Sequence, residues 1–97
     1  METALRALAH PTRRRILELV WDAERTATEV AEHVGLSKPA TSQHLRVLRE
    51  VELVVVRPDR NRRLYRARLE RIDEVRDFLE EFRGTRLDRL RESCERR

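Results

Sequence analysis

The feature that most constrains this chain is a three-residue break, Gly35–Ser37, between two stretches of helical periodicity. The apolar residues before the break are Ala27, Val30, Ala31 and Val34, and those after it are Ala40, Thr41, Leu45, Leu48 and Val51. Gly35 can adopt the left-handed conformation that ends a helix, and Ser37 is a good N-cap. We therefore expect a helix that starts at Thr26, a tight turn, and a longer helix over about 38–50.

Helical signals also precede this unit. A short helix over about 4–8 is expected at the N-terminus, and His10 before Pro11 ends it because a residue before proline avoids the helical region. Pro11 then suits the first turn of a second helix. The buried side of that helix comprises Ile16, Leu17, Leu19 and Val20. Thr26 and Glu29 fit a capping box at the start of the third helix.

A hairpin and one more helix are expected after residue 52. The β-branched run Leu53–Val56 predicts a strand, Arg57–Asn61 contains turn residues, and Leu64–Leu69 alternates like a half-exposed returning strand. A C-terminal helix over about 71–95 follows. Its apolar stripe comprises Ile72, Val75, Leu79 and Phe82, and continues past Gly84 with Leu87, Leu90 and Cys94. The expected fold is mostly α with a small β-hairpin, in a single domain over residues 1–97.

The composition of the chain narrows the classes of protein to which it can belong. Charged residues make up 41% of the 97-residue chain, which is too polar for a self-sufficient core, so a partner subunit is expected. The net charge of +4 and the pI of about 10.4 are typical of a nucleic-acid binder. The single cysteine excludes an intramolecular disulfide. With no membrane-length apolar run and no signal-peptide pattern, we expect a cytoplasmic protein without a membrane partner.

The break between the two helices is typical of a helix-turn-helix, which places its second helix in the major groove of DNA. With Leu45 and Leu48 turned inward, the outer face of helix 38–50 carries Lys38, Ser42, Gln43, Arg46 and Arg49. Glutamine can pair with adenine, lysine with guanine, and arginine can hold phosphates. An ordinary solvated face is the alternative, but no acidic residue occurs from Lys38 to Arg49.

The expected hairpin is rich in arginine. It contains Arg57, Arg60, Arg62, Arg63, Arg66 and Arg68. Such a β-ribbon can act as a wing that contacts the DNA backbone or minor groove. The alternative is that the charges only protect an edge strand from aggregation. Helix and wing together favour duplex DNA as the partner more strongly than either feature alone.

Three segments resemble the ArsR/SmtB-type winged-helix repressors. They are Ala7–Leu17, Leu36–Arg49 and the wing end Arg62–Arg66, within a similarity that covers roughly 4–82. The resemblance implies a winged helix-turn-helix, a homodimer whose first and last helices pair, and one recognition helix per operator half-site. Where family members carry a small residue and glycine after the recognition helix, this chain has Val51 and Glu52.

The candidate site residues form two sets. The candidate DNA contacts are Lys38, Thr41, Ser42, Gln43, His44, Arg46, Arg49, Arg60, Arg62 and Arg63. The candidate dimer contacts are Leu5, Leu8, Ile72, Val75, Leu79 and Phe82.

We expect no metal site and no cofactor. The family's cysteine pair would fall near Thr26–Glu29, where no thiol occurs, and its other site needs a histidine on the last helix. That helix offers only carboxylates: Asp73, Asp77, Glu80 and Glu81. His10, His33 and His44 lack the spacing of metal ligands. Cys94 suits packing better than redox sensing, which needs an activated thiolate.

We therefore expect a sequence-specific, duplex-DNA-binding transcriptional regulator that acts as a homodimeric repressor. No phosphate-cradling loop or nucleophile motif predicts an enzyme. A protein-interaction module, or a thiol or ligand sensor on the same scaffold, is the alternative. The sequence does not identify an effector.

Overall fold

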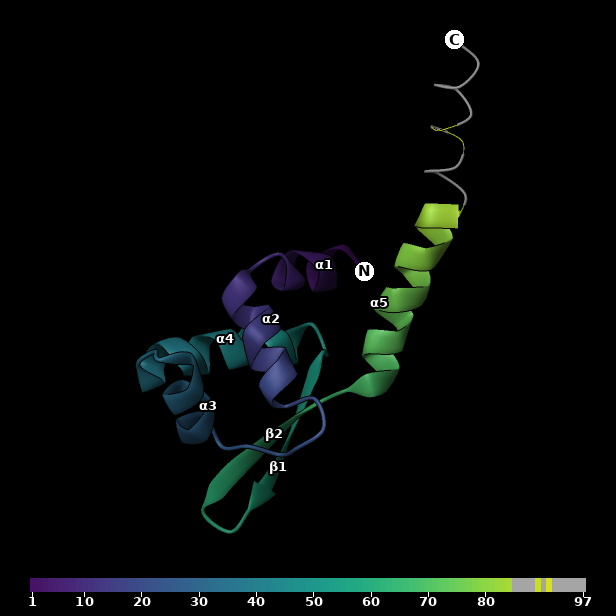
Figure 1. Ribbon diagram of the computed structural model, residues 1–97. Coiled ribbons are helices and arrows are strands. Elements are labelled where there is room, and N and C mark those ends of the chain that lie inside the picture. Colours follow the sequence, from purple (N-terminus) through teal and green to yellow (C-terminus); the bar gives the residue numbers. More distant parts are fainter. Residues whose placement is uncertain (85–88, 90, 92–97) are drawn as a thin grey trace.

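The computed structural model describes residues 1–84, 89 and 91. Its elements, in chain order, are α1 (Glu2–Leu8), α2 (Pro11–Leu19), α3 (Ala27–Val34), α4 (Lys38–Glu50), β1 (Val54–Asp59), β2 (Arg62–Ala67) and α5 (Leu69–Phe82). Helices α1 to α4 form the body, the hairpin extends from one end of it, and α5 projects away from it (Figure 1). The predicted mostly α fold with a β-hairpin is confirmed.

The turn between α3 and α4 forms as its residues predict. In the capping box, the Glu29 amide donates to Thr26 Oγ1 at 3.2 Å and the Thr26 amide donates to Glu29 Oε1 at 3.1 Å. Gly35 has φ of 70° and ends α3. Ser37 Oγ then accepts from the Ala40 amide at 3.2 Å and starts α4. These local bonds satisfy amides that a helix start otherwise leaves free.

The two strands pair further toward the tip of the hairpin than predicted, and the tip is shorter. β1 continues through Pro58 to Asp59, which pairs with Arg62, so only Arg60 and Asn61 form the loop. The expectation of a five-residue tip over 57–61 is therefore wrong. β1 is the edge strand, where proline is tolerated because its missing N–H is not needed by a neighbour.

The other edge of the hairpin is joined to the loop between α2 and α3. Arg25 and Tyr65 form an antiparallel bridge in which the Arg25 amide donates to the Tyr65 carbonyl at 3.1 Å and the Tyr65 amide donates back at 2.8 Å. The Ala67 amide also donates to the Val20 carbonyl at 2.8 Å. The hairpin is therefore fixed by backbone bonds to the segment that leads into α3.

A left-handed residue connects α4 to the hairpin. Glu52 has φ of 64°, its amide donates to the Arg49 carbonyl at 3.0 Å, and the Leu53 amide donates to the Leu48 carbonyl at 2.9 Å. This pair of bonds is a Schellman motif, with Leu48 and Leu53 both fully buried beside it. Glu52 thus occupies a position that favours glycine.

The core lies among α1, α2, α3, α4 and the base of the hairpin. Its largest fully buried side chains are Ile16, Leu45, Leu48, Leu53, Val20, Val30 and Val54. From α5, only Val75 is buried in this cluster, and Ile72 packs against it. In the described part of the chain, no helix is both long enough and apolar enough to span a membrane.

Candidate nucleic-acid interface

The outer face of α4 is polar and exposed. Lys38, Ser42, Gln43, Arg46 and Arg49 all lie on it, as the periodicity predicted. Arg46 Nε lies 3.0 Å from Glu50 Oε1, and both side chains are exposed. The face therefore combines small hydrogen-bonding groups near the helix start with cations further along.

Thr41 is not part of this face. It is fully buried between α4 and the core, so its side chain cannot reach a ligand that approaches α4 from outside. The assignment of Thr41 as a DNA contact is corrected for this reason. Its Oγ1 atom is also buried without a hydrogen-bond partner.

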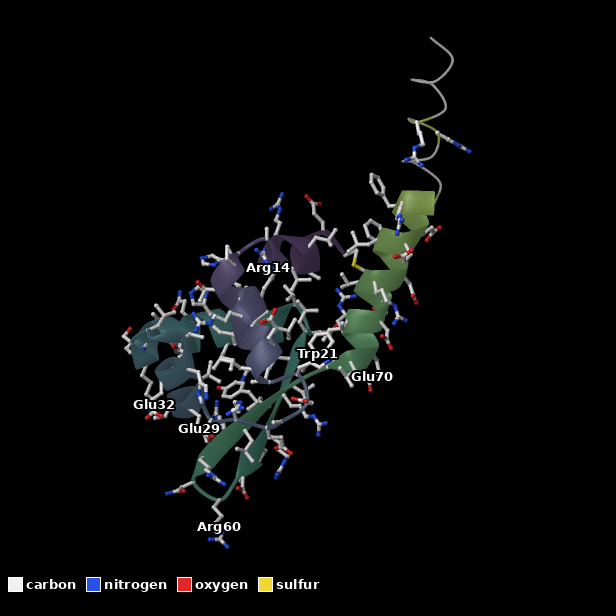
Figure 2. All side chains as sticks on the ribbon, in the orientation of Figure 1. Arg14, Trp21, Glu29, Glu32, Arg60 and Glu70 are labelled. Carbon is white, nitrogen blue, oxygen red and sulfur yellow. The ribbon has the colours of Figure 1, made fainter. Side chains whose placement is uncertain are left out.

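The hairpin lies beside one flank of α4, and we call it the wing from here on. A hollow between them is lined by Thr26, Ala27, Thr28, Lys38, Ser42, Asn61, Arg62, Arg63 and Tyr65. A second hollow next to it is lined by Arg49, Val56, Pro58 and Arg63. Arg63 borders both hollows, and Arg60 stands at the tip of the wing (Figure 2).

The basic residues of α4 and the wing differ in whether a carboxylate neutralises them. Arg62 donates from Nε and Nη2 to Asp59 Oδ2 at 3.2 and 3.1 Å, and Arg57 Nε lies 2.7 Å from Glu24 Oε2. Among the described residues, no ion pair neutralises Lys38, Arg49, Arg60 or Arg63. This exposed, uncompensated positive charge is what a polyanion would meet.

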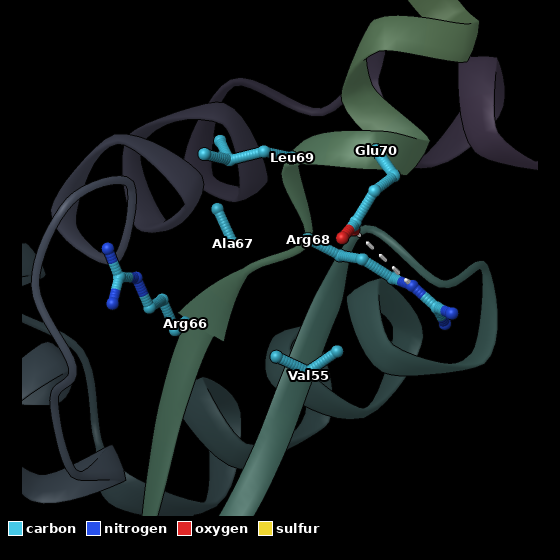
Figure 3. A pocket seen from close by; sticks show the side chains of 6 residues that line it. All are labelled: Val55, Arg66, Ala67, Arg68, Leu69 and Glu70. Carbon is cyan, nitrogen blue, oxygen red and sulfur yellow. Dashed lines mark ion pairs between the residues drawn. The ribbon is translucent and has the colours of Figure 1, made fainter.

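At the base of the wing, carboxylates lie near the basic side chain of Arg68. A shallow pocket where the wing meets α5 is lined by Val55, Arg66, Ala67, Arg68, Leu69 and Glu70 (Figure 3). Arg68 lies 4.0 Å from Glu70 and 3.7 Å from Glu52, so carboxylates surround it. Arg68 is therefore paired with carboxylates at the junction with α5 and does not extend the uncompensated positive surface.

His44 lies on the flank of α4 that faces α2. Its Nδ1 accepts from Arg13 Nε at 3.3 Å, from a residue 31 positions earlier in the chain. The His10 ring contacts it edge-on, with ring centres 4.9 Å apart. Burial lowers the pKa of His44, and the neighbouring His10 and Arg13 lower it further. His44 is therefore held in the neutral form.

The candidate dimer residues differ in burial and divide into three groups. Leu79 and Phe82 on α5 are 48% and 46% exposed. Leu5, Leu8 and Ile72 are partly buried against the core. Val75 is only 4% exposed and packs within its own core, which corrects its assignment as an interface residue.

Sequence reasoning missed Phe78, which is 41% exposed on α5. Phe78 lies three residues after Val75 and one before Leu79, and this apolar spacing was the signal that could have found it. Leu87, Leu90 and Cys94, which continue the predicted stripe, lie outside the described residues.

The residues at the family's metal positions do not fit a metal. Thr26 and Glu29 are engaged in the capping box, which also lowers the pKa of Glu29 through the Thr26 hydrogen bonds. On α5, Asp73 and Asp77 lie 3.5 and 3.6 Å from Arg76. The described residues contain no group of three or more histidine, cysteine or carboxylate side chains suited to a metal ion.

Comparison with known proteins identifies relatives of the chain. The sequence model for the bacterial regulatory proteins of the arsR family matches residues 10–56. The transcriptional repressor SdpR of Bacillus subtilis is 41% identical over 54 residues, which cover 56% of this chain and 60% of SdpR. The arsenical resistance operon repressor of Staphylococcus xylosus is 32% identical over 80 residues, which cover 82% of this chain and 77% of the repressor.

Solved structures give the same result. The crystal structure of a possible transcriptional regulator for arsenical resistance is similar with a TM-score of 0.78 and 39% identity, covering 93% of this chain and 94% of that one. The homodimeric winged helix-turn-helix DNA-binding domain of a possible ArsR-family regulator from Mycobacterium bovis has a TM-score of 0.71 and 26% identity, covering 89% and 80%. The fold is a winged helix-turn-helix, and the chain belongs to the arsR family of bacterial regulatory proteins.

Proposed function

We propose that this transcriptional regulator is a repressor that binds specific sequences of duplex DNA as a homodimer. The observation that carries the proposal is the exposed face of α4 beside a wing with uncompensated cations. A helix about 10–12 Å wide fits a major groove about 12 Å wide, so this face can approach base edges. The relatives named as repressors support the direction of regulation.

The side chains divide into two roles in this proposal. Lys38, Ser42 and Gln43 lie on the first turns of α4, where they can hydrogen-bond base edges. Arg49, Arg60 and Arg63 hold phosphates, which gives affinity and salt dependence but little sequence preference. Arg62 contributes less than Arg63, because it must first leave Asp59.

The homodimer rests on α5. Leu79, Phe82 and Phe78 are large apolar side chains that are each more than two-fifths exposed on a helix projecting from the body. Such surface is unfavourable in water and is covered when two copies pack their α5 helices around a two-fold axis. Two recognition helices then meet two half-sites of a palindromic operator.

Selection of bound sequences from random duplex DNA tests this function directly. We expect a palindromic consensus with half-sites about 10 base pairs, or a multiple of that, apart. If no duplex is selected and the chain instead binds another protein with an affinity that does not depend on salt, the result favours a protein-interaction module. Enrichment of no sequence would leave only nonspecific binding and contradict the proposal.

Two substitutions then separate base reading from phosphate binding. Gln43→Ala should weaken operator binding by about 1–3 kcal/mol and relax the consensus at one position per half-site. Arg63→Ala should weaken all duplexes alike and reduce the log–log salt slope by about one. Arg76→Ala removes the same charge from α5, away from α4, and is the matched control. Fluorescence anisotropy with operator and scrambled duplexes across a salt series measures all three.

A further inference from the structure

A cluster of basic side chains occupies the flank of α4 that faces α2. It comprises His44 on α4, His10 at the N-cap of α2, and Arg13 on the first turn of α2. His10 Nδ1 accepts from the Thr12 amide at 3.3 Å, and His44 Nδ1 accepts from Arg13 Nε at 3.3 Å. Both rings therefore use Nδ1 as an acceptor, so the proton of each neutral ring is on Nε2. Neither Nε2 has a hydrogen-bond partner among the described residues.

This cluster and the wing lie on opposite flanks of α4. Ser42 borders the hollow next to the wing, and His44 follows it by two residues, which turns it about 200° around the α4 axis. The two side chains thus mark opposite flanks of the helix. A helix that fills the major groove has a phosphate backbone along each flank. The wing adjoins one flank of α4, and the histidine cluster adjoins the other.

We propose that His10, Arg13 and His44 form a second binding site for a DNA backbone phosphate, and that occupying it takes up a proton from solvent. The inference rests on the proposed DNA-binding function and extends it to a site on the opposite flank from the wing. His44 receives the proton at Nδ1, which ends its acceptor role toward Arg13. The freed guanidinium and the imidazolium then both donate to the phosphate.

In the free protein, the surroundings of His44 oppose its protonation. Burial, His10 and Arg13 all lower its pKa. No carboxylate in the described part of the chain forms an ion pair with His10, Arg13 or His44. A phosphate would be the first anion at this cluster, so the His44 pKa must rise when it binds.

Several charged groups of the other elements packed on α4 make contacts outside this cluster. On α1, Arg6 pairs with Glu2 at 3.0 Å. On α3, Glu29 caps its own helix and His33 Nδ1 lies 2.8 Å from the Glu29 carbonyl, while Glu32 is exposed. At the wing, Arg57 pairs with Glu24 and Asp59 with Arg62. On α4 itself, Arg46 pairs with Glu50.

The test is the pH dependence of operator binding at constant ionic strength. A ligand that raises a histidine pKa binds more tightly as the pH falls through the histidine range. We expect the affinity for the selected duplex to be about fivefold higher at pH 6.0 than at pH 8.0. Uptake of one proton can change a binding constant by at most about tenfold for each pH unit, so this change is consistent with a single histidine. Fluorescence anisotropy at several pH values measures this change.

Two variants localise the effect. In His44→Gln, the side-chain carbonyl still offers an acceptor to Arg13 but cannot take up a proton, so the affinity should lose its pH dependence. His33→Gln is the matched control, because His33 lies on α3 outside the cluster, and it should retain the wild-type profile. In the wild type, NMR titration of the histidine rings should show a higher His44 pKa with duplex than without it. This measurement does not require that either variant folds or binds DNA.

The outcomes separate this inference from the proposed function. Specific binding with a flat pH profile and an unchanged His44 pKa would overturn the phosphate site and leave the regulator's DNA binding intact. A pH profile that persists in His44→Gln would also overturn it. Failure to bind any duplex at any pH would remove the proposed function and, with it, this site.

Discussion

Thr41 illustrates how one atom can limit stability. Its hydroxyl is fully buried on α4 and lacks a hydrogen-bond partner, whereas a buried polar group normally has one. Valine has nearly the same shape without the hydroxyl. We therefore expect Thr41→Val to raise the free energy of unfolding by about 1 kcal/mol. Urea unfolding followed by circular dichroism measures the change. Thr41→Ser, which keeps the hydroxyl and loses the methyl group, should do the opposite, and a Thr41→Val protein less stable than wild type would contradict the explanation.

His44 should make stability depend on pH. Because its pKa is lower in the folded protein than in the unfolded chain, the unfolded state binds more protons as the pH falls. Stability is therefore full above the unfolded value of about 6.5 and declines as the pH falls through it toward the folded value. Denaturant unfolding from pH 8 to pH 5 should show this loss, and His44→Gln should reduce it. Equal losses in the two proteins would assign the effect to other groups.

The same two residues show what a sequence pattern can specify. Periodicity correctly put Thr41 among the inward residues of α4, yet Thr41 was also assigned to the DNA contacts, and its burial overrules that second assignment. The neutral state of His44 depends on its burial and on His10 and Arg13, which lie more than thirty residues away in sequence. Spacing along one helix carries no information about such a neighbour.

At the scale of elements, the end of α4 is a strained point. Glu52 adopts φ of 64°, where a residue with a Cβ atom is disfavoured by about 1–2 kcal/mol. Its ion pair with Arg68 is long, at 3.7 Å, and exposed, so losing it matters little. Glu52→Gly should therefore stabilise the protein by about 1 kcal/mol in thermal or urea unfolding, after the greater backbone entropy of glycine is subtracted. Glu52→Ala keeps the strain and is the control; equal effects of the two variants would exclude backbone strain as the cause.

Elements whose ends are fixed locally were predictable, and those fixed by tertiary contacts were not. Thr26, Gly35 and Ser37 cap their helices with residues a few positions away, so their sequence sufficed. Pro58 was assigned to a turn because proline is a common turn residue. Its place in β1 depends on which strand lies at the sheet edge, and that was set by Arg25 pairing with Tyr65.

At the scale of the whole molecule, we expect α5 to carry the interface of the proposed homodimer. Leu79 is 48% exposed, so Leu79→Lys should disrupt association between copies without unfolding either one. Analytical ultracentrifugation at micromolar concentration should give a dimer for the wild type and a shift toward monomer for the variant, with an unchanged circular dichroism spectrum. Val75→Lys, by contrast, should unfold the protein because Val75 is buried. A monomeric wild type would refute the homodimer, and a fully dimeric Leu79→Lys would refute this interface.

The bridge between Arg25 and Tyr65 makes the position of the wing measurable in solution. Each residue's amide donates to the other's carbonyl, so neither amide can exchange its hydrogen with water until the wing separates from the segment before α3. The two amides should therefore exchange at matched rates, slower than the amides at the exposed loop Arg60–Asn61. Their common rate reports how often the wing detaches, and hence how rigidly it is held against the segment before α3 in the free protein.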